Sequence, residues 1–347
     1  MALFRMKPHY RKRGGTLSYY GTATALAAAR ANLAATSVGN YALFGGGDNT
    51  SNDCYKSVEV YDNTLVHSSN ISLASACAYL EATSVGDYAL FGGGSSQSQY
   101  VPEKSLNKVS AFNTSLIYTA APSLTRPSKA LAATSVGNYA LFGGGIELLT
   151  GSNTDLNDIN AYNTSLVKSI PSNLNTPAYD LAATSVGDYA LFGGGYIYRT
   201  AAFSDIVTAY NTSLTKVSVT RLSQARKNLE ATSVGNYALF GGGYDRNWSV
   251  SNIIEIYDQA LTKINSIELS NVKVDFAATS VGNYALFGGG SNKTVDVYDI
   301  SLTHILTNDT SVEHLESAAT SVGNYALFGG GWGASHLLDT VDVYQVT

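Results

Sequence analysis

A thirteen-residue segment, ATSVGNYALFGGG, occurs seven times in this chain and constrains its fold more than any other feature. The copies differ only by Asn or Asp after the first glycine, and they recur at intervals of 41 to 51 residues. Such a period is typical of repeat proteins, in which each unit buries its apolar face against its neighbours. We therefore expect one continuous architecture rather than the two domains that 347 residues would otherwise suggest. The copies begin at Ala35, Ala82, Ala133, Ala183, Ala231, Ala278 and Ala319.

Each copy is predicted to form a β-hairpin. Val-Gly-Asn or Val-Gly-Asp followed by Tyr is a two-residue turn signal, because Gly at the first central position of a type II′ turn supplies a positive φ that other residues resist. In the second arm, as in residues 41–44, consecutive residues are apolar, so apolar side chains point to both sides of the strand. This pattern is typical of a strand buried on both faces. The glycine triplet then ends the strand and permits close approach of a neighbouring sheet.

A second motif follows each copy and predicts a third strand that ends in Tyr or Phe. An Asn-Thr-Ser type turn follows, and a short Leu-containing segment such as residues 214–217 supplies a fourth strand. The copies of this motif are VEVYDNTL from Val58, VSAFNTSL from Val109, INAYNTSL from Ile159, VTAYNTSL from Val207, IEIYDQAL from Ile254, VDVYDISL from Val295 and VDVYQVT from Val341.

Seven units of four strands predict an all-β fold, a seven-bladed β-propeller with four antiparallel strands per blade. The seventh unit ends at Thr347, just after its third strand. Residues 16–19 precede the first hairpin by nearly the distance at which residues 64–67 precede the second. We therefore expect the N-terminal strand to close the last blade and remove exposed strand edges. The predicted organisation is a basic N-terminal arm over residues 1–15 and the propeller over residues 16–347.

The apolar strand that ends in a glycine run, followed by a strand with an aromatic residue, resembles the kelch repeat. The resemblance covers residues 16–347, and YALFGGG is similar to near-identical kelch units of bacterial and phage-encoded proteins. Kelch repeats usually carry a tryptophan after the tyrosine of the third strand, whereas the aromatics here are followed by Asn-Thr-Ser or similar residues. These aromatics are Tyr61, Phe112, Tyr162, Tyr210, Tyr257 and Tyr298. WD40 repeats fit less well, because neither Trp248 nor Trp332 is in a Trp-Asp dipeptide.

Composition indicates a folded body with a basic arm. The chain is 45% hydrophobic and 14% charged, which allows a large core. The arm has five basic and no acidic residues, whereas the rest of the chain has 16 basic and 26 acidic residues, so no nucleic acid is expected as a partner of the body. The arm is expected to be a solvated or docking tail, which docks on a neighbouring chain of an assembly or on the propeller's own side. The alternative is a contact with nucleic acid or an anionic surface. Its basic residues are Arg5, Lys7, Arg11, Lys12 and Arg13.

Targeting and redox signals are sparse. No apolar run approaches the roughly 20 residues of a membrane span, and the first residues lack the long apolar core of a signal peptide. Synthesis in the cytoplasm followed by incorporation into a virion or surface assembly is the expected route. Cys54 and Cys77 are the only cysteines, too few for a disulfide framework, and the sequence leaves open whether they pair.

Functional residues are expected where the seven units differ, because loops on a rigid frame carry recognition. The units differ in the loop between the second and third strands and in the approach to each first strand. We expect both segments on one face, around the mouth of a central channel. Alternate residues of a strand share one side. The residues five and three positions before each repeated Ala are therefore both expected on that face. The apolar residue two positions before the Ala is expected on the opposite side.

The predicted binding face combines polar side chains with aromatic rings. Aromatic planes supply contact area and polar groups fix orientation, which suits a glycan or a protein. The alternative for any one residue is that it packs its own loop. The predicted binding residues are Arg30, Tyr79, Asp180, Arg226, Lys273, Asp275, His314 and Glu316, with the loop aromatics Tyr55, Tyr100, Tyr196, Tyr198, Tyr244, Trp248 and Trp332.

No catalytic residue, metal or cofactor is predicted. The sequence contains no phosphate loop, HExxH motif, nucleophile elbow or cysteine metal cluster. We therefore predict a non-enzymatic recognition or adhesion module that binds a protein or glycan. The alternative is a sugar-active enzyme, mutarotase-like or hydrolytic, in which His314 and Glu316 serve as an acid/base pair at the channel mouth. The family resemblance implies a virion- or cell-surface-associated component.

Overall fold

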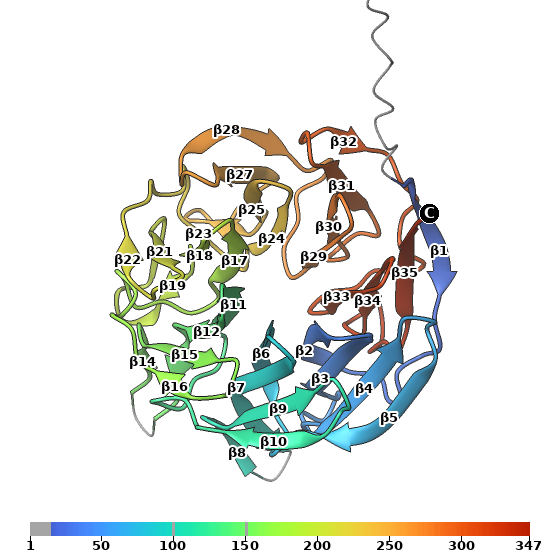
Figure 1. Cartoon of the computed structure of the whole chain (residues 1–347), viewed down its shortest axis with the longest axis horizontal. Coiled ribbons are helices and arrows are strands. Elements are labelled where there is room, and N and C mark those ends of the chain that lie inside the picture. Colours follow the sequence, from blue (N-terminus) through green and yellow to red (C-terminus); the bar gives the residue numbers. More distant parts are fainter. Residues whose placement is uncertain (1–14, 99–100, 150–151) are drawn as a thin grey trace, which may run out of the picture.

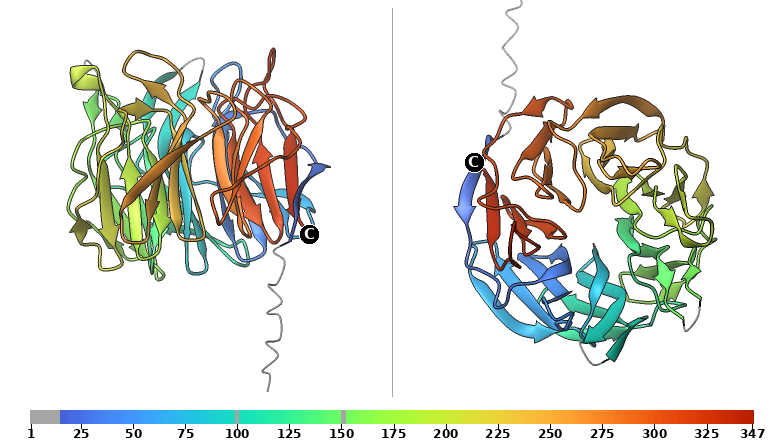
Figure 2. Two further views of the ribbon diagram at one scale, coloured as in Figure 1. Left: turned by 90° about the horizontal axis from the view of Figure 1, so that it is seen from above. Right: turned by 180° about the vertical axis from the view of Figure 1, so that it is seen from behind.

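Seven antiparallel four-stranded sheets form a ring, and each sheet is one blade of a β-propeller (Figure 1). The computed structural model describes residues 15–98, 101–149 and 152–347. Within these ranges, helix is limited to one short 3-10 turn, η1 (Tyr198–Thr200). The first strand of each blade lies at the centre of the ring and the fourth at its rim (Figures 1 and 2). The predicted all-β, seven-bladed architecture is confirmed.

The blades follow one another in chain order, each with its strands ordered from the centre outward. Blades 1 to 3 consist of β2 (Ala31–Val38), β3 (Tyr41–Asp48), β4 (Ser57–Asp62) and β5 (His67–Ser72); β6 (Ala78–Val85), β7 (Tyr88–Ser98), β9 (Val109–Asn113) and β10 (Tyr118–Ala121); and β11 (Ala132–Val136), β12 (Tyr139–Gly143), β15 (Ile159–Asn163) and β16 (Lys168–Ser169). Blades 4 and 5 consist of β17 (Ala182–Val186), β18 (Tyr189–Gly193), β21 (Val207–Asn211) and β22 (Lys216–Val217); and β24 (Glu230–Val234), β25 (Tyr237–Gly241), β27 (Ile253–Asp258) and β28 (Lys263–Glu268).

The last two blades complete the ring. They consist of β29 (Ala277–Val281), β30 (Tyr284–Gly288), β31 (Val295–Asp299) and β32 (His304–Ile305); and β33 (Ala318–Val322), β34 (Tyr325–Gly329), β35 (Val341–Val346) and β1 (Leu17–Thr22). The variable segments add β8 (Val101–Ser105) beside β7, and the pairs β13 (Ile146–Glu147) with β14 (Thr154–Asp155), β19 (Tyr196–Ile197) with β20 (Ala202–Phe203), and β23 (Arg226–Lys227) with β26 (Tyr244–Asp245).

The repeated segment forms the inner hairpin of every blade, as predicted. The first glycine of each copy has a φ between +52° and +56°, and the following Asn or Asp has a negative φ, which is the pattern of a type II′ turn. On the second strand, Ala42, Leu43 and Phe44 are fully buried, and their counterparts in the other blades are at most 2% exposed. The strand is therefore covered on both faces.

An Asn or Asp side chain closes the turn after the third strand. In blade 3, Asn163 Oδ1 accepts hydrogen bonds from Ser165 N at 3.0 Å and Val167 N at 2.9 Å. Leu166 then takes a left-handed conformation, with φ of +59°, and is buried. The same turn begins at Asp62, Asn113, Asn163, Asn211, Asp258 and Asp299. The Asn-Thr-Ser tripeptides thus have the turn-forming role expected of them.

The N-terminal strand closes the last blade, also as predicted. Strand β1 pairs antiparallel with β35, with Leu17 opposite Val346. The Thr16 N–H donates to the Thr347 carbonyl at 3.0 Å, so the two ends of the described chain meet in one sheet (Figure 1). This pairing satisfies the outer edge of β35.

The hydrophobic core lies between adjacent blades. Each of its seven clusters combines residues of two neighbouring blades. At every interface the YALF phenylalanine packs on the first glycine of the preceding blade's triplet. A Cβ atom added to Gly45 would lie 2.8 Å from Phe91 Cε1, and one added to Gly329 would lie 3.0 Å from Phe44 Cε1. Only glycine leaves room for the ring at this distance.

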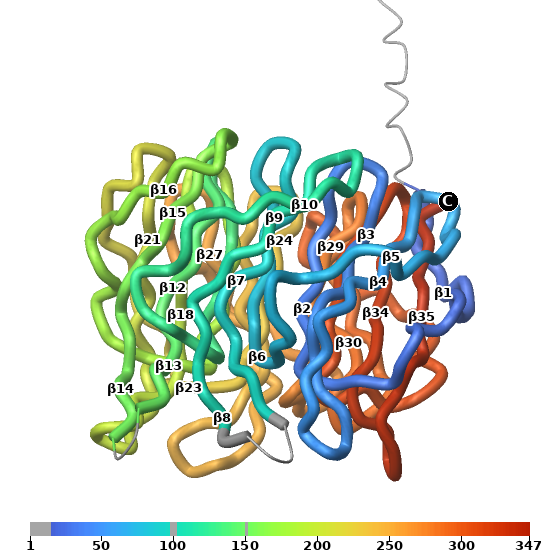
Figure 3. Tube along the Cα trace, turned by 90° about the horizontal axis from the view of Figure 1, so that it is seen from below, coloured from blue at the N-terminus to red at the C-terminus, as the bar shows by residue number. Residues whose placement is uncertain are grey.

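The two ends of the ring differ in what they carry. The type II′ turns and the Asx turns share one end, where Gly39 lies against Thr114 of the next blade. The loops between second and third strands, including residues 196–206 and 244–252, lie at the opposite end, near the approaches to the first strands (Figure 3). We call this end the variable-loop face.

The glycine–phenylalanine contact predicts a graded loss of stability. Gly45→Ala is expected to lower the free energy of unfolding by about 1–3 kcal/mol, because the new methyl group overlaps the buried Phe91 ring. Gly241→Ala at the equivalent position should cost less, since its Cβ would lie 3.1 Å from Phe287 Cε1 rather than 2.8 Å. Urea unfolding measures both, and equal stability of Gly45→Ala and the unmodified protein would contradict the argument.

Candidate functional site

Seven residues with left-handed backbone surround the mouth of the central channel. Each lies three positions before a repeated Ala and has a φ between +51° and +55°. Backbone hydrogen bonds link neighbours across blade boundaries: Asp180 N donates to Ala130 O, and Asn228 N donates to Asp180 O, both at 3.0 Å. Their side chains line a cavity of about 180 Å³ at the variable-loop face. The seven are Asn32, Tyr79, Ala130, Asp180, Asn228, Asp275 and Glu316.

The left-handed residue breaks the alternation of sides that the sequence predicted. Alternation holds only for continuous extended backbone, and a φ near +50° turns the chain away from it. The side chains five positions before the repeated Ala therefore enter the blades. Arg30, Arg226, Lys273 and His314 are each 0% exposed, so their predicted place on the binding face is wrong. Tyr79, Asp180, Asp275 and Glu316 do lie at the mouth.

Each of these four buried basic side chains is paired with an acid on the third strand of its own blade. Arg30 Nη2 lies 2.9 Å from Glu59 Oε1, and His314 Nε2 lies 2.7 Å from Asp342 Oδ2. The Arg226–Glu255 and Lys273–Asp296 pairs are longer, at 3.8 Å. Since an unpaired buried charge is costly, both members of such a pair must be present or absent together.

Blades 2 to 4 lack the charged pair altogether. They have uncharged residues five positions before the repeated Ala and at the position on the third strand that is equivalent to Glu59. The pairs are Cys77 with Ser110, Ser128 with Asn160, and Ala178 with Thr208. In blade 3, Ser128 Oγ donates to the Gly144 carbonyl at 2.9 Å. The equivalent carbonyl in blade 5 accepts from Arg226 Nη1 at 2.6 Å. In five blades the side chain at this position thus contacts the carbonyl of the middle glycine, whether it is basic or the hydroxyl of Ser128. Ala178 in blade 4 has no polar side-chain atom for this contact.

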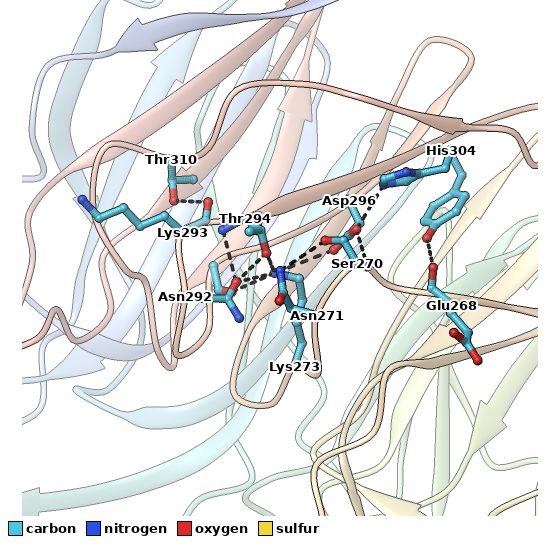
Figure 4. A network of polar contacts seen from close by, with 12 residues as sticks. Glu268, Ser270, Asn271, Lys273, Asn292, Lys293, Thr294, Asp296, His304 and Thr310 are labelled. Atoms are coloured by element: carbon cyan, nitrogen blue, oxygen red, sulfur yellow. Dashed lines mark hydrogen bonds and ion pairs between the residues drawn. The ribbon is translucent and has the colours of Figure 1, made fainter.

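In blade 6, the Lys273 ammonium group is surrounded by hydrogen-bond acceptors of its own blade (Figure 4). Lys273 Nζ donates to both the carbonyl and the hydroxyl oxygen of Thr294 at 2.7 Å, and to Asn292 Oδ1 at 2.9 Å. Burial lowers the pKa of Lys273 to about 8, an effect that Asp296 opposes. Asp296 Oδ1 in turn accepts from Ser270 N at 2.8 Å. Lys273 therefore has a structural role.

The blade 7 pair joins the channel side of the blade to the closing strand. His314 Nδ1 lies 2.7 Å from Gly330 O, and its Nε2 lies 2.7 Å from Asp342 Oδ2. Both ring nitrogens are therefore within hydrogen-bond distance of a partner inside the blade. Tyr19 on β1 donates to Asp342 Oδ1 at 2.5 Å. His314 is consequently engaged within the blade and does not assemble with Glu316 as an acid/base pair.

The channel mouth is acidic. Asp180, Asp275 and Glu316 are half-buried there. Burial raises the pKa of all three carboxyl groups, and the neighbouring carboxylates of Asp275 and Asp48 add to the effect on Glu316. Lys227 opposes the rise for Asp180, to which it lies 3.4 Å away. The mouth therefore combines three carboxyl groups with the ammonium group of Lys227, which contacts Asp180 directly.

Two glutamates face the channel below the mouth, and neither is among the binding residues predicted from the sequence. Glu81 and Glu230 replace the alanine that the other five blades carry immediately before the repeated segment. Burial raises the pKa of Glu81 from 4.5 to about 8, while burial and repulsion from Glu81 and Asp275 raise that of Glu230 well above its usual value. The departure from alanine in two of seven otherwise equivalent positions was the signal that could have identified them.

Five aromatic side chains form one cluster across blades 4 and 5. Trp248 lies 5.2 Å from Phe203 and 5.9 Å from Tyr244, between ring centroids. Tyr196 lies 5.7 Å from Tyr179 and 5.2 Å from Phe203. We call these five rings the blade 4–5 cluster. Lys227 Nζ lies above the rings of Trp248 at 5.0 Å and Tyr196 at 5.1 Å, within the range of cation–π attraction.

The other predicted aromatics are distributed around the same face. Tyr198 on η1 is half exposed, and Tyr79 at the mouth lies 4.7 Å from Lys129 Nζ. Tyr55 lies 4.5 Å from the buried Arg30 guanidinium, and Trp332 forms backbone hydrogen bonds with Leu315. Tyr100 and the arm residues Arg5, Lys7, Arg11, Lys12 and Arg13 lie outside the described residues.

The described ranges contain no disulfide, no cluster of metal-ligating side chains and no helix suited to span a membrane. Cys54 and Cys77 are both free thiols, which answers the question that the sequence left open. The residues described contain no group of three or more His, Cys, Asp or Glu side chains placed to hold a metal ion. Among these residues, no helix is long and apolar enough to cross a membrane.

The fold and the channel together define the class of this protein as a seven-bladed β-propeller. No model of a known protein family matches the chain, and no curated protein matches it. What the propeller binds must therefore be argued from its own residues.

The buried pair of blade 7 yields a double-mutant prediction. His314→Ala is expected to lower the free energy of unfolding by about 3–5 kcal/mol, because it leaves the buried Asp342 carboxylate without its His314 partner. The double variant His314→Ser, Asp342→Asn should recover most of that loss, since blade 3 has Ser128 and Asn160 at these positions. Urea unfolding of the three proteins tests this, and equal losses in the single and double variants would refute the coupling.

The channel glutamates predict a pH-dependent gain in stability. Folded Glu81 binds a proton more tightly than unfolded Glu81, so its contribution to stability falls as pH rises from 4.5 to about 8. Glu81→Gln should therefore stabilise the ring at pH 8 by roughly 1–3 kcal/mol, allowing for screening in the open channel, and have little effect at pH 5. Melting temperatures measure this. The control is Asp188→Asn, an exposed change already present in five other copies, and an equal gain at both pH values would oppose the assignment.

Proposed function

We propose that this propeller is a non-enzymatic recognition module of the kelch type, which holds a protein or glycan on its variable-loop face. The observation that carries the proposal is the division of the chain into a constant scaffold and a variable rim. The inner hairpins are nearly identical, whereas the segments at the channel mouth differ in every blade. A frame that is constant in seven copies and a rim that is different in each is the arrangement expected when the rim makes contacts outside the chain.

Exposure of aromatic side chains supports this assignment. Trp248 is 57% exposed and Tyr198 is 50% exposed, and both lie on the loops of blades 4 and 5. Large aromatic rings supply much of the contact area in recognition surfaces, and neighbouring polar groups fix the orientation of the ligand. The titratable residues Asp180, Asp275 and Glu316 lie at the adjoining mouth.

An adhesion or virion-associated role is the setting that we propose for this recognition, on the resemblance of the repeat to kelch units of bacterial and phage-encoded proteins. The basic arm would provide a second contact, to a neighbouring chain of the assembly. Both statements extend the proposal by analogy of sequence pattern and fold.

The variable-loop face can be tested by exchanging loops within the protein. Blade 6 has the shortest connection, residues 291–294 with the sequence SNKT, so it supplies a replacement for residues 196–205 of blade 4 and 244–252 of blade 5. The unmodified protein and the loop-exchange variant are compared on a glycan array and an array of surface-protein peptides. Binding by the unmodified protein that the variant loses is the expected result.

A matched control changes the opposite face. Thr164→Ala with Ser165→Ala changes two exposed residues of the blade 3 Asx turn and should leave binding unchanged. Circular dichroism confirms folding of each variant. Failure of the folded, unmodified protein to bind either array, or binding lost only in the opposite-face variant, would contradict the proposal.

A further inference from the structure

Trp248 is presented by a rigid turn of a kind that the protein uses elsewhere to bury leucine. Asp245 Oδ1 accepts from Asn247 N at 2.8 Å and Ser249 N at 3.0 Å, which is the Asx-turn pattern. Trp248 is the fourth residue of this turn and has a left-handed φ of +59°. Leu261, the fourth residue of the Asx turn that begins at Asp258, has the same φ. Leu261 is 8% exposed, whereas Trp248 is 57% exposed. The same turn thus holds an indole at the surface where its counterpart holds an apolar side chain in the core.

This arrangement is costly unless the exposed ring has a partner. An indole that is 57% exposed keeps a large apolar surface in contact with water, which is unfavourable until a partner covers it. Rings of the blade 4–5 cluster, Phe203 and Tyr244, hold the Trp248 ring in place, and Lys227 lies over it. Because the ring is already immobilised, a ligand would lose little extra conformational entropy on stacking against it.

The polar groups beside the ring define the class of ligand. Lys227 Nζ lies 3.4 Å from Asp180 Oδ2, so the ammonium and carboxylate groups neutralise each other and favour no net charge in a ligand. Lys227 offers donors and Asp180 offers acceptors, and a hydroxyl group can bind both because it donates and accepts. A ligand with an apolar face and a rim of hydroxyl groups matches an indole bordered by this pair.

We infer that Trp248, Lys227 and Asp180 form a carbohydrate subsite, in which a neutral pyranose ring stacks on Trp248 and its hydroxyl groups bind Lys227 and Asp180. This inference rests on the proposed function and commits it to a glycan rather than a protein. Tyr198 is a second exposed ring on the same rim. Its turn η1 is fixed by Asp155, which accepts from Tyr198 N at 2.8 Å and Arg199 N at 3.0 Å. The subsite is therefore suited to one residue of an oligosaccharide that continues along the rim.

The presence of only two tryptophans makes the test specific for this site. Trp332→Phe leaves Trp248 as the single tryptophan, and Trp248→Phe leaves Trp332. Each protein is titrated with neutral oligosaccharides of glucose, galactose, mannose and N-acetylglucosamine while emission and acrylamide quenching are recorded. Stacking should shift the Trp248 emission to the blue and lower its quenching about twofold, because the exposed ring becomes covered. The Trp332 signal should not change.

Affinity provides the second arm of the experiment. Trp248→Ala is expected to weaken binding of the best oligosaccharide about tenfold, and Trp248→Phe should restore part of the loss. Tyr118→Ala, which truncates an exposed ring on the outer strand β10 and outside the predicted binding residues, is the control and should bind normally. Failure of all four oligosaccharide series to bind at millimolar concentration, or unchanged affinity in Trp248→Ala, would overturn the subsite.

The outcomes separate this inference from the proposed function. Binding that is lost on loop exchange and kept in Trp248→Ala would overturn the subsite while supporting the variable-loop face. Selective capture of a peptide without any oligosaccharide would likewise overturn the carbohydrate assignment and support recognition of a protein. Binding that survives both changes would contradict both proposals.

Discussion

The packing of a phenylalanine on a glycine of the preceding blade is the contact on which this ring depends. Both partners lie in the same repeated segment, so each copy supplies the ring to one neighbour and the glycine to the other. The series runs from Gly45 and Phe91 to Gly329 and Phe44, where it closes on itself. A change in one copy would create an interface that the other six do not match. This reciprocity explains why the segment is nearly invariant within one chain.

The fold could be predicted from the sequence because its signals are local and occur seven times. The hairpin turn, the Asx turn and the closing strand all followed from short patterns, and all are present. The position of Arg30 and its three counterparts could not be predicted, because a single residue with positive φ reverses the side to which they point. Nothing in the residue types at that position requires a left-handed backbone, since Tyr79, Ala130 and Glu316 adopt it as well as Asn and Asp.

The candidate site also has a part that could be predicted from the sequence and a part that could not. The acidic residues of the mouth and the exposed rings of the rim were expected from their variability between copies. The cluster that joins Tyr196 to Trp248 depends on two loops of different blades, and sequence patterns carry no information about such a contact. The buried pairs have a further role in organisation. Because the buried Glu59 needs the Arg30 partner that only its own blade supplies, such a pair favours the correct third strand beside each of the nearly identical hairpins.

The closing strand has a consequence for synthesis on the ribosome. The hydrogen bond between Tyr19 and Asp342 spans 323 residues, so β1 is made first and pairs last. At typical elongation rates its edge waits roughly 15–65 s for β35 to emerge. During that interval six complete blades can form an open arc whose two ends expose the same interface, one offering phenylalanine and the other glycine. Two nascent chains on one messenger RNA would meet through complementary ends, and prompt capture of β1 is what keeps each ring separate.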